Sequence, residues 1–343
     1  MSIWNEQLGP DSDVVISSRV RIARNISGYP YTNMNDINSL TNLMEELNNI
    51  IDKIKKQLGL TWIDLRNTSP IDKLCYIENH LMSMEMLGGD LQGALVLNKD
   101  DSLSVMINEE DHLRIQSILP GRQLEMAYKI CDDFEQRLGT KLNYSYDEKL
   151  GFLTSCPTNV GTGLRVSAMM HLPALTQTGA IKKILEACAK MGVAVRGAYG
   201  ESSKAEGNIF QISNQVTLGY CEEEIIENML HIINQIIEKE RNLRQKILNS
   251  DKISLEDKIF RAYGILANTR RIESNEAMEL MSWVRLGIDI KVIDFINPIN
   301  MNKLLVELQP GNIQKRAGGE LHPAQRDEKR ADLCRQMMKK EEV

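Results

Sequence analysis

Residues 154–165 carry the most informative run of the sequence, which reads Thr154-Ser155-Cys156-Pro157-Thr158-Asn159-Val160-Gly161-Thr162-Gly163-Leu164-Arg165. Glycine lets a backbone approach phosphate oxygens closely, and a helix N-terminus presents unpaired N–H groups to an anion. We predict that the glycine turn opens a helix over residues 164–172. The run lacks the lysine of a P-loop and the third glycine of a dinucleotide fingerprint, so it predicts neither of those sites.

Arginines stand in similar settings elsewhere in the chain. Val14-Val15-Ile16 predicts a short strand that continues into Ser17-Ser18-Arg19-Val20-Arg21, where period two places Arg19 and Arg21 on one face. Arg114, Arg165 and Arg196 likewise stand beside turns or strand ends. Adjacent guanidinium groups repel unless an anion lies between them, so the pair favours an anion site. The alternative is an ordinary surface strand whose arginines bind nothing. Together with the glycine turn, these arginines favour a nucleoside triphosphate held by guanidinium groups.

Carboxylates form the other half of the predicted site. Glu109, Glu110 and Asp111 follow a predicted strand, where three adjacent carboxylates are costly unless a cation or cationic substrate binds. A solvated acidic turn is the alternative. The run Arg196-Gly197-Ala198-Tyr199-Gly200-Glu201 repeats the association of arginine, glycine and carboxylate, and predicts a loop that closes over a substrate.

One of the six cysteines is a candidate for chemistry. Cysteines are usually buried residues that pack in the core, and such a packing role is the alternative to a chemical role for Cys156. Its position beside Pro157 and the glycine turn favours a partly exposed thiol of lowered pKa. The other five are interpreted as packing residues, and the scattered spacing indicates neither a disulfide framework nor a zinc ribbon.

Composition limits the classes of function. The 343 residues carry a formal net charge of −6, which argues against a dedicated nucleic-acid binder. No stretch approaches the ~18–20 apolar residues of a membrane span, and Met1 to Glu6 has neither a basic leader nor an apolar core. We therefore expect a cytoplasmic protein without direct contacts to nucleic acid or membrane.

The apolar spacing predicts an α+β core followed by a helical unit. It indicates helices that begin near Asp36, that span 122–138 and 180–191, and that run from Glu222 to about Leu248. It also indicates a hairpin of strands 94–97 and 103–107, and further strands at 193–196 and 209–212. Residues 254–286, 300–308 and 323–340 read as helices. We predict a lead at 1–13, a catalytic domain at 14–244 and a helical domain at 250–343, whose roughly ninety residues are few enough for pairing with a second chain to help bury its core.

Four of these segments, taken in order over residues 14–244, resemble the ATP:guanido phosphotransferases, the family of creatine and arginine kinases. They are Ser17–Arg21, Asn108–Arg114, Cys156–Arg165 and Arg196–Glu201. The resemblance is strongest to the protein-arginine kinases of bacteria, because the chain lacks the N-terminal helical domain of the small-molecule kinases and carries a helical unit after residue 250. It implies an antiparallel sheet flanked by helices, ATP and Mg²⁺ as cofactors, and phosphoryl transfer to arginine in proteins.

The resemblance also implies roles for individual residues. Glu110 and Glu201 would hold the acceptor guanidinium, Cys156 would be a thiolate beside it, and Glu109 would contribute to the surroundings of a magnesium ion that is held through ATP. The residues implied at ATP are Ser17, Ser18, Arg19, Val20, Arg21, His80, Arg114, Arg165, Val166, Ser167, Ala168, Met169, Arg196, Gly197, Ala198, Tyr199, Gly200 and Glu201.

The C-terminal unit contains Arg326-Asp327-Glu328-Lys329-Arg330-Ala331, which resembles the phosphoarginine-binding allosteric motif of the same branch. Arg326, Asp327, Arg330 and Ala331 would form this pocket. An ordinary solvated helix face, with charges four residues apart, is the alternative.

The resemblance implies partners as well: an activating zinc-binding adaptor, a heat-shock repressor as substrate, the ClpC-ClpP protease that degrades marked proteins, and a second copy of the chain. Two other functions remain open from the residues. One is a kinase for free arginine or another small guanidino compound, and the other is an inactive adaptor that binds phosphoarginine.

Overall fold

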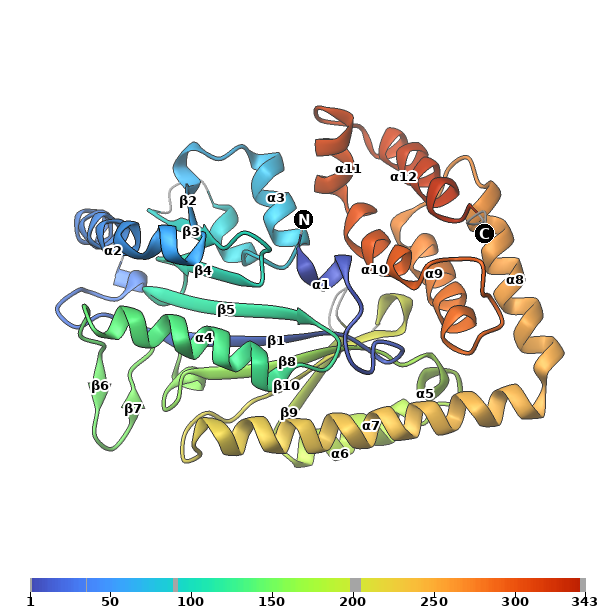
Figure 1. Ribbon diagram of the computed structural model, residues 1–343, viewed down its shortest axis with the longest axis horizontal. Coiled ribbons are helices and arrows are strands. Elements are labelled where there is room, and N and C mark those ends of the chain that lie inside the picture. Colours follow the sequence, from blue (N-terminus) through green and yellow to red (C-terminus); the bar gives the residue numbers. More distant parts are fainter. Residues whose placement is uncertain (1, 35, 89–91, 198–204, 340–343) are drawn as a thin grey trace.

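The computed structural model describes residues 2–34, 36–88, 92–197 and 205–339 (Figure 1). The strands are β1 (Val15–Arg24), β2 (Thr61–Asp64), β3 (Ala94–Leu97), β4 (Leu103–Ile107), β5 (Leu113–Pro120), β6 (Tyr146–Asp147), β7 (Gly151–Phe152), β8 (Leu164–His171), β9 (Val193–Gly197) and β10 (Ile209–Asn214). The helices are α1 (Ile3–Glu6), α2 (Ile37–Leu58), α3 (Pro70–Glu78), α4 (Leu124–Gly139), α5 (Pro173–Gln177), α6 (Ile181–Lys190), α7 (Glu222–Ser250), α8 (Lys252–Asn268), α9 (Ser274–Asp289), α10 (Pro298–Glu307), α11 (Pro310–Ala317) and α12 (Pro323–Met337).

Eight of the strands form one antiparallel sheet in the order β2-β3-β4-β5-β1-β8-β10-β9. Helices α4, α6 and α7 pack on this sheet, and α8 to α12 gather into a separate helical layer at one end (Figure 1). The expected α+β class, with an antiparallel sheet, flanking helices and a helical C-terminal part, is confirmed.

The predicted elements with strong periodicity are present. Helix α2 begins after Asp36, whose carboxylate accepts a hydrogen bond from Ser39 N at 3.2 Å, and ends at Gly59 in the left-handed conformation. The hairpin of β3 and β4, the strands β9 and β10, and the long helix α7 lie where the spacing predicted them.

The predicted helix over residues 164–172 is wrong. These residues form β8, which pairs with β1 on one side and β10 on the other. Nearly every side chain of β8 is buried because both faces of this central strand are covered, so the alternation that marks a half-exposed strand is missing. The glycine turn therefore leads into a strand, and the anion site that a helix N-terminus would have provided does not exist there.

The two faces of the sheet differ in character. Register pairs Val20 with Val166, and these side chains join the large apolar cluster beneath α2, α4, α6 and α7. On the opposite face Arg21 pairs with Arg165, so that face is charged at its centre. Apolar clusters flank this charged centre on both sides, one with Leu95 and Met106, the other continuing into the C-terminal helices.

The C-terminal helices share a core with the sheet. Ile118, Met169 and Ile209 of the sheet pack in one cluster with residues from α8 to α12, and Trp4 of α1, which is fully buried, joins them. Residues near the beginning and near the end of the described chain therefore pack in one core.

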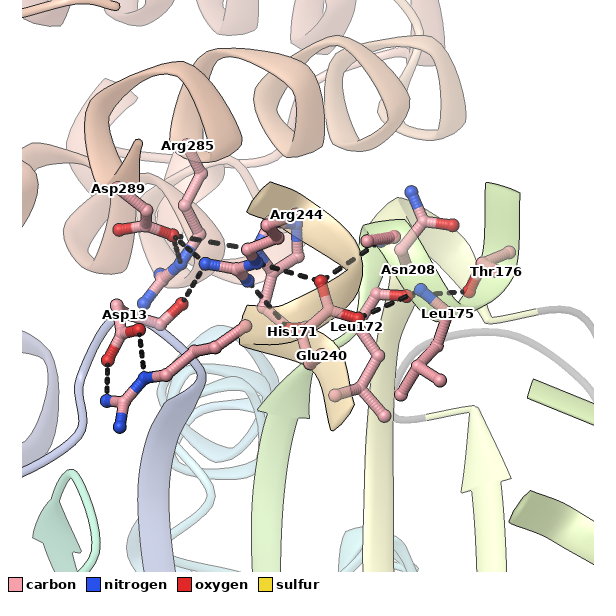
Figure 2. A network of polar contacts seen from close by, with 12 residues as sticks. Asp13, His171, Leu172, Leu175, Thr176, Asn208, Glu240, Arg244, Arg285 and Asp289 are labelled. Atoms are coloured by element: carbon pink, nitrogen blue, oxygen red, sulfur yellow. Dashed lines mark hydrogen bonds and ion pairs between the residues drawn. The ribbon is translucent and has the colours of Figure 1, made fainter. Parts of the chain in front are cut away.

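A buried polar network ties helix α7 to this region (Figure 2). The Glu240 carboxylate accepts hydrogen bonds from Ala174 N and Leu175 N at 3.0 and 2.9 Å and from Arg244 Nε at 2.8 Å. Arg244 also lies 3.3 Å from an oxygen of Asp289 on α9. The pair Glu240 and Arg244 thus fixes the start of α5 and the end of α9 to the same helix.

Within the described ranges, no helix combines the length and the apolar character that crossing a bilayer requires.

Candidate active site

Five arginines meet on the charged face of the sheet because of strand register. Arg19 and Arg21 alternate along β1, Arg165 lies opposite Arg21 on β8, and Arg114 of β5 lies opposite Ala23. Arg196 is on β9 opposite Gln211, whose other partner is Met169 on the same face as Arg165. All five arginines predicted to hold phosphates therefore share one face.

Electrostatics make this group of arginines unfavourable by itself. Burial lowers the pKa of Arg21 well below its ordinary value, and the charges of Arg19, Arg114 and Arg165 lower it further. Burial likewise lowers the pKa of Arg165, together with the charges of Arg196 and Arg114. The Nε atoms of Arg21 and Arg165 are buried without a hydrogen-bond partner among the described residues. A polyanion placed between these side chains would relieve the repulsion and accept the unused N–H groups.

The acidic loop after β4 faces these arginines. Glu109 is buried and forms an ion pair with Arg114, while its second oxygen accepts a hydrogen bond from Glu110 N at 2.9 Å. Glu110 is exposed at the end of the loop. Partial desolvation and the charges of Asp111 and Glu109 raise its pKa, against the opposing effects of Arg114 and a hydrogen bond with Cys156. A raised pKa suits a carboxylate that accepts a proton during a reaction.

Cys156 lies beside Glu110. Its thiol is half-buried, and its sulfur is 3.0 Å from the Thr158 hydroxyl. A cavity of about 190 Å³ joins this thiol and Glu110 to Arg21, Arg114 and Arg165. The structure thus brings three arginines, a carboxylate and a thiol to one cavity.

Two residues for which the sequence predicted no individual role, Asp111 and Asn25, hold the loops together. Asp111 accepts hydrogen bonds from Asn25 Nδ2 at 2.7 Å and from Ser155 N at 2.6 Å. Asn25 in turn accepts from His112 N at 2.9 Å. These contacts set the spacing between Glu110 and Cys156. Asp111 was visible within the acidic run, whereas nothing in the sequence marked Asn25.

The glycine turn is shaped by close backbone packing. Gly163 has φ +64°, and a Cβ there would lie 2.6 Å from the carbonyl oxygen of Ala23. The buried guanidinium of Arg24 donates to the Thr162 carbonyl at 2.8 Å and to Glu135 at 2.9 Å. Gly163 is therefore required by its contact with β1, and the prediction that this turn begins a helix is wrong.

Other residues that were expected at ATP lie in different places. The side chains of Val20, Val166 and Ala168 belong to the apolar core on the opposite face, so they support the strands that carry the arginines. Ser18 is buried there too, and its hydroxyl donates to the Gly121 carbonyl at 2.8 Å.

The charged face holds three more of them. Ser17 and Ser167 are buried, and the Ser167 hydroxyl is 3.4 Å from the Arg19 carbonyl oxygen. Met169 packs toward the C-terminal helices. Gly197 ends β9, and the predicted residues Ala198, Tyr199, Gly200 and Glu201 lie outside the described residues.

His80 is in a turn after α3 with φ +62°, not within a helix. Its ring stacks on Trp4 with centroids 5.4 Å apart, and its carbonyl accepts a hydrogen bond from Gln116 at 2.7 Å. Burial, with a smaller contribution from Arg19, lowers its pKa to about 3. His80 is thus a neutral ring next to the arginine group.

The C-terminal motif lies on α12. Arg330 is buried and donates to the carbonyls of Leu308 and Ile272 at 3.1 and 3.0 Å and to Asp327 at 2.6 Å, while Ala331 is fully buried. Arg326 is half-buried and lies near Glu78 of α3. In this arrangement Arg330 and Asp327 connect the helices, and Arg326 is the arginine of the motif with access to solvent.

Three or more His, Cys, Asp or Glu side chains do not gather into a metal-binding group in the part of the chain that the structure describes.

Comparison with known proteins assigns both parts of the chain to families. Residues 42–243 match the model of the ATP:guanido phosphotransferase C-terminal catalytic domain, and residues 252–343 match the protein-arginine kinase McsB C-terminal domain. The chain is 45% identical to the protein-arginine kinase of Brevibacillus brevis over 340 residues, which is 98% of this chain and 95% of that protein. It is 42% identical to the protein-arginine kinase of Moorella thermoacetica, over 98% and 97% of the two chains.

The fold is similar to solved structures of more distant proteins. Lombricine kinase superposes with a TM-score of 0.61 at 22% identity, over 71% of each chain. One half of a duplicated taurocyamine kinase from Schistosoma mansoni gives the same TM-score of 0.61 at 23% identity, over 78% of this chain and 41% of that one.

Proposed function

The chain belongs to the ATP:guanido phosphotransferase family, and from this premise we propose that it is a protein-arginine kinase, which transfers the γ-phosphoryl group of ATP to a guanidinium nitrogen of arginine in proteins. The observation that carries this function is the cavity at the centre of the charged face. Arg21, Arg114 and Arg165 line it together with Glu110 and Cys156. A triphosphate matches the arginines, and a guanidinium matches the carboxylate and thiol.

The acceptor must be oriented and lose a proton. A guanidinium has a pKa of roughly 12.5–13.8, so its nitrogen is a weak nucleophile near neutral pH. We expect Glu110 and Glu201 to hold the planar group, and Glu110 accepts the proton as the nitrogen attacks the γ-phosphorus and the bond from this phosphorus to the bridging oxygen of the leaving ADP breaks. Cys156 stabilises the charge of the substrate. Correct orientation of two reactants can contribute on the order of 7–11 kcal/mol.

The arginines act on the phosphate side. They neutralise charge on the transferring group as it passes from ATP to the acceptor, a reaction in which the protein itself does little covalent chemistry. Mg²⁺ bound to the ATP phosphates would supply further neutralisation of this charge. Glu109 contributes through its ion pair, because it keeps the Arg114 guanidinium next to Glu110.

One experiment separates the candidate functions. The protein is incubated with Mg-ATP and either an unfolded protein or free arginine, and acid-labile phosphate on arginine nitrogen is sought by mass spectrometry. Phosphoarginine in the unfolded protein is the expected result. Labelling of free arginine alone would favour a small-molecule kinase, and no label on either would favour the inactive adaptor, although that adaptor has no use for Glu110, Cys156 and Glu201.

The C-terminal motif is proposed to bind phosphoarginine and to act on the catalytic domain. Arg326 would supply the exposed cation, and its neighbour Glu78 accepts hydrogen bonds from Gly311 N and Asn312 N at 2.6 and 2.8 Å. Glu78 ends α3, two residues before His80, which lies near Arg19. This chain of contacts supports a coupling between the motif and the ATP site. If free phosphoarginine changes neither activity nor assembly, the coupling does not exist.

Further partners are proposed from family membership. A homodimer through the helical domain is supported by exposed apolar side chains on α8, at Ile253, Phe260 and Ile265. The other proposed partners are an activating zinc-binding adaptor, a heat-shock repressor and the ClpC-ClpP protease. With these partners, the enzyme would act in the cytoplasm. Sedimentation of the full chain and of Phe260→Ser tests the dimer.

A further inference from the structure

A second cleft shares none of its described lining residues with the active-site cavity. It has a volume of about 190 Å³ and opens between the end of α6, the end of β10 and the first turns of α7. Its lining includes Met191, Val216, Tyr220, Ile225 and Met229, with Glu224 as the charged side chain among the described lining residues. The cleft is therefore apolar with an acidic edge.

Large apolar side chains are exposed around this cleft. The exposed fractions are 47% for Met191, 44% for Val216, 48% for Leu218 and 55% for Tyr220. Single exposed apolar residues need no explanation, but a group of them around a cleft marks a binding surface. The charged side chain at the edge of the cleft is Glu224, in the first turn of α7. This edge would attract a positively charged partner.

The cleft is joined to the active site by hydrogen bonds. Thr217, between Val216 and Leu218, donates from its hydroxyl to the carbonyls of Thr158 and Val160 at 3.0 and 2.7 Å. Its own carbonyl accepts from Thr162 N at 3.1 Å. Thr158 lines the active-site cavity. The loop that borders the apolar cleft and the loop that carries Cys156 are thus one connected structure.

We propose that this cleft binds an apolar side chain of the protein substrate, in an extended segment that also presents the arginine to be phosphorylated. The proposal rests on the proposed function, since it requires a polypeptide as the acceptor. Charge supports a substrate segment as the occupant: a segment rich in arginine is positive, and the edge of the cleft is negative. The apolar lining would then select segments in which a large apolar residue accompanies the target arginine.

The test compares variants of the cleft with a matched control. Met191→Ser and Tyr220→Ala remove exposed lining, and Asn228→Trp fills the cleft from the exposed side of α7. The control is Met126→Ser on α4, which is equally exposed at 53% but lies outside the lining. The substrates are peptides with one target arginine, in which a single leucine is moved through the neighbouring positions, and a peptide with serine in its place.

The expected result is a rise in KM for the best leucine peptide of about tenfold, the scale set by burial of one large apolar side chain. Values of kcat, ATP affinity and KM for the serine peptide should stay unchanged, as should all parameters of Met126→Ser. Thermal unfolding verifies that each variant is folded.

Two failures are distinguishable. If the wild-type enzyme phosphorylates no peptide and no unfolded protein, the proposed function fails. If it phosphorylates them and the three cleft variants keep the wild-type KM, substrate docking is overturned. A change in sedimentation without a change in KM would likewise overturn it and identify the cleft as a contact between copies.

Discussion

Arginines occupy two regions of this molecule under opposite conditions. Arg21 and Arg165 on the sheet face other arginines, and their Nε atoms have no hydrogen-bond partner within the described residues. Arg244 and Arg330 are buried as well, but each is bonded to a carboxylate and to backbone carbonyls. The residue type is the same and the degree of pairing differs.

This difference separates function from stability. A buried charge with its partners satisfied holds elements together, and loss of one member leaves the other unpaired. Like charges beside one another, such as Arg21 and Arg165, weaken the free protein, and binding of an anion would stabilise them. We therefore predict that Arg21 and Arg165 contribute to binding of ATP, whereas Arg244 and Arg330 contribute to the stability of the fold.

The largest expected effect is on the Glu110 carboxylate, which lines the same cavity as Arg21 and Arg165. Glu110→Ala should lower the rate of phosphoryl transfer by roughly 10²–10⁴-fold, the usual loss when a general base is removed. ATP affinity, measured by calorimetry, should remain near the wild-type value, and exposed Glu148→Ala serves as control. An equal loss of ATP affinity in Glu110→Ala would contradict the division of roles between Glu110 and the arginines of the cavity.

The paired arginines should respond in stability. Arg244→Ala leaves Glu240 buried without its cation and should lower the free energy of unfolding by about 3–5 kcal/mol, as measured by urea denaturation. The neighbouring Arg241 is 44% exposed and pairs with Asp11 and Asp13 at the surface. Arg241→Ala should therefore cost less than about 1 kcal/mol. Equal losses in the free energy of unfolding for the two substitutions would show that the buried pair contributes no more to stability than the surface pair.

Substitution of Arg165 on the charged face should change the affinity for ATP. Arg165→Ala should weaken ATP binding by roughly 10- to 100-fold, since a hydrogen bond to a charged group contributes about 1.5–3 kcal/mol. Its free energy of unfolding should stay equal or rise, because a like charge is removed from beside Arg21. Calorimetry with ATP and urea denaturation on one preparation give both values. A destabilised Arg165→Ala would show that this arginine also supports the fold.

A smaller effect is expected from pH. His171 is fully buried, donates or accepts at Ser282 Oγ at 2.8 Å, and has a pKa lowered well below its ordinary value, first by burial and then by Arg285 and Arg244. As pH falls below the unfolded value of about 6.5, the unfolded chain takes up a proton that the folded chain does not. His171 should therefore cost up to about 1.4 kcal/mol of stability per pH unit below that point.

The variant His171→Gln keeps a polar contact for Ser282 and removes this proton uptake. Between pH 6 and 4 its free energy of unfolding should fall less steeply with pH than that of the wild type. The difference in slope should correspond to the uptake of one proton. His231→Gln, at an exposed position on α7, should keep the wild-type slope. An unchanged slope in His171→Gln would show that this ring is protonated in the folded protein.

The sequence could predict much of the fold because many elements have one buried face. Helices α2 and α7 show clear 3.6-residue periodicity, and the hairpin of β3 and β4 has a polar turn between apolar runs. Strand β8 could not be recognised in this way, since it is covered on both faces and its only half-exposed side chain is Arg165. Where burial is complete, spacing no longer distinguishes a strand from a helix.

The candidate site shows the same limit in another form. Segments around Arg19, Glu110 and Cys156 could be selected by residue type and by resemblance to a family. The register that places Arg21 opposite Arg165 depends on strands that are more than a hundred residues apart, and no local pattern encodes it. Asn25 and Asp111 position the acceptor side through long-range hydrogen bonds, which become visible when the chain is folded.

The core that joins the sheet to the C-terminal helices has a consequence for synthesis of the protein. Ile118, Met169 and Ile209 are covered by a cluster that includes Leu333 and Cys334, close to the end of the chain. A ribosome translates from the N-terminus, so this apolar surface of the sheet stays uncovered while the C-terminal helices are still being synthesised. The nascent enzyme is then an aggregation-prone chain with exposed apolar residues and arginines, and it has the same character as the unfolded proteins proposed as its substrates.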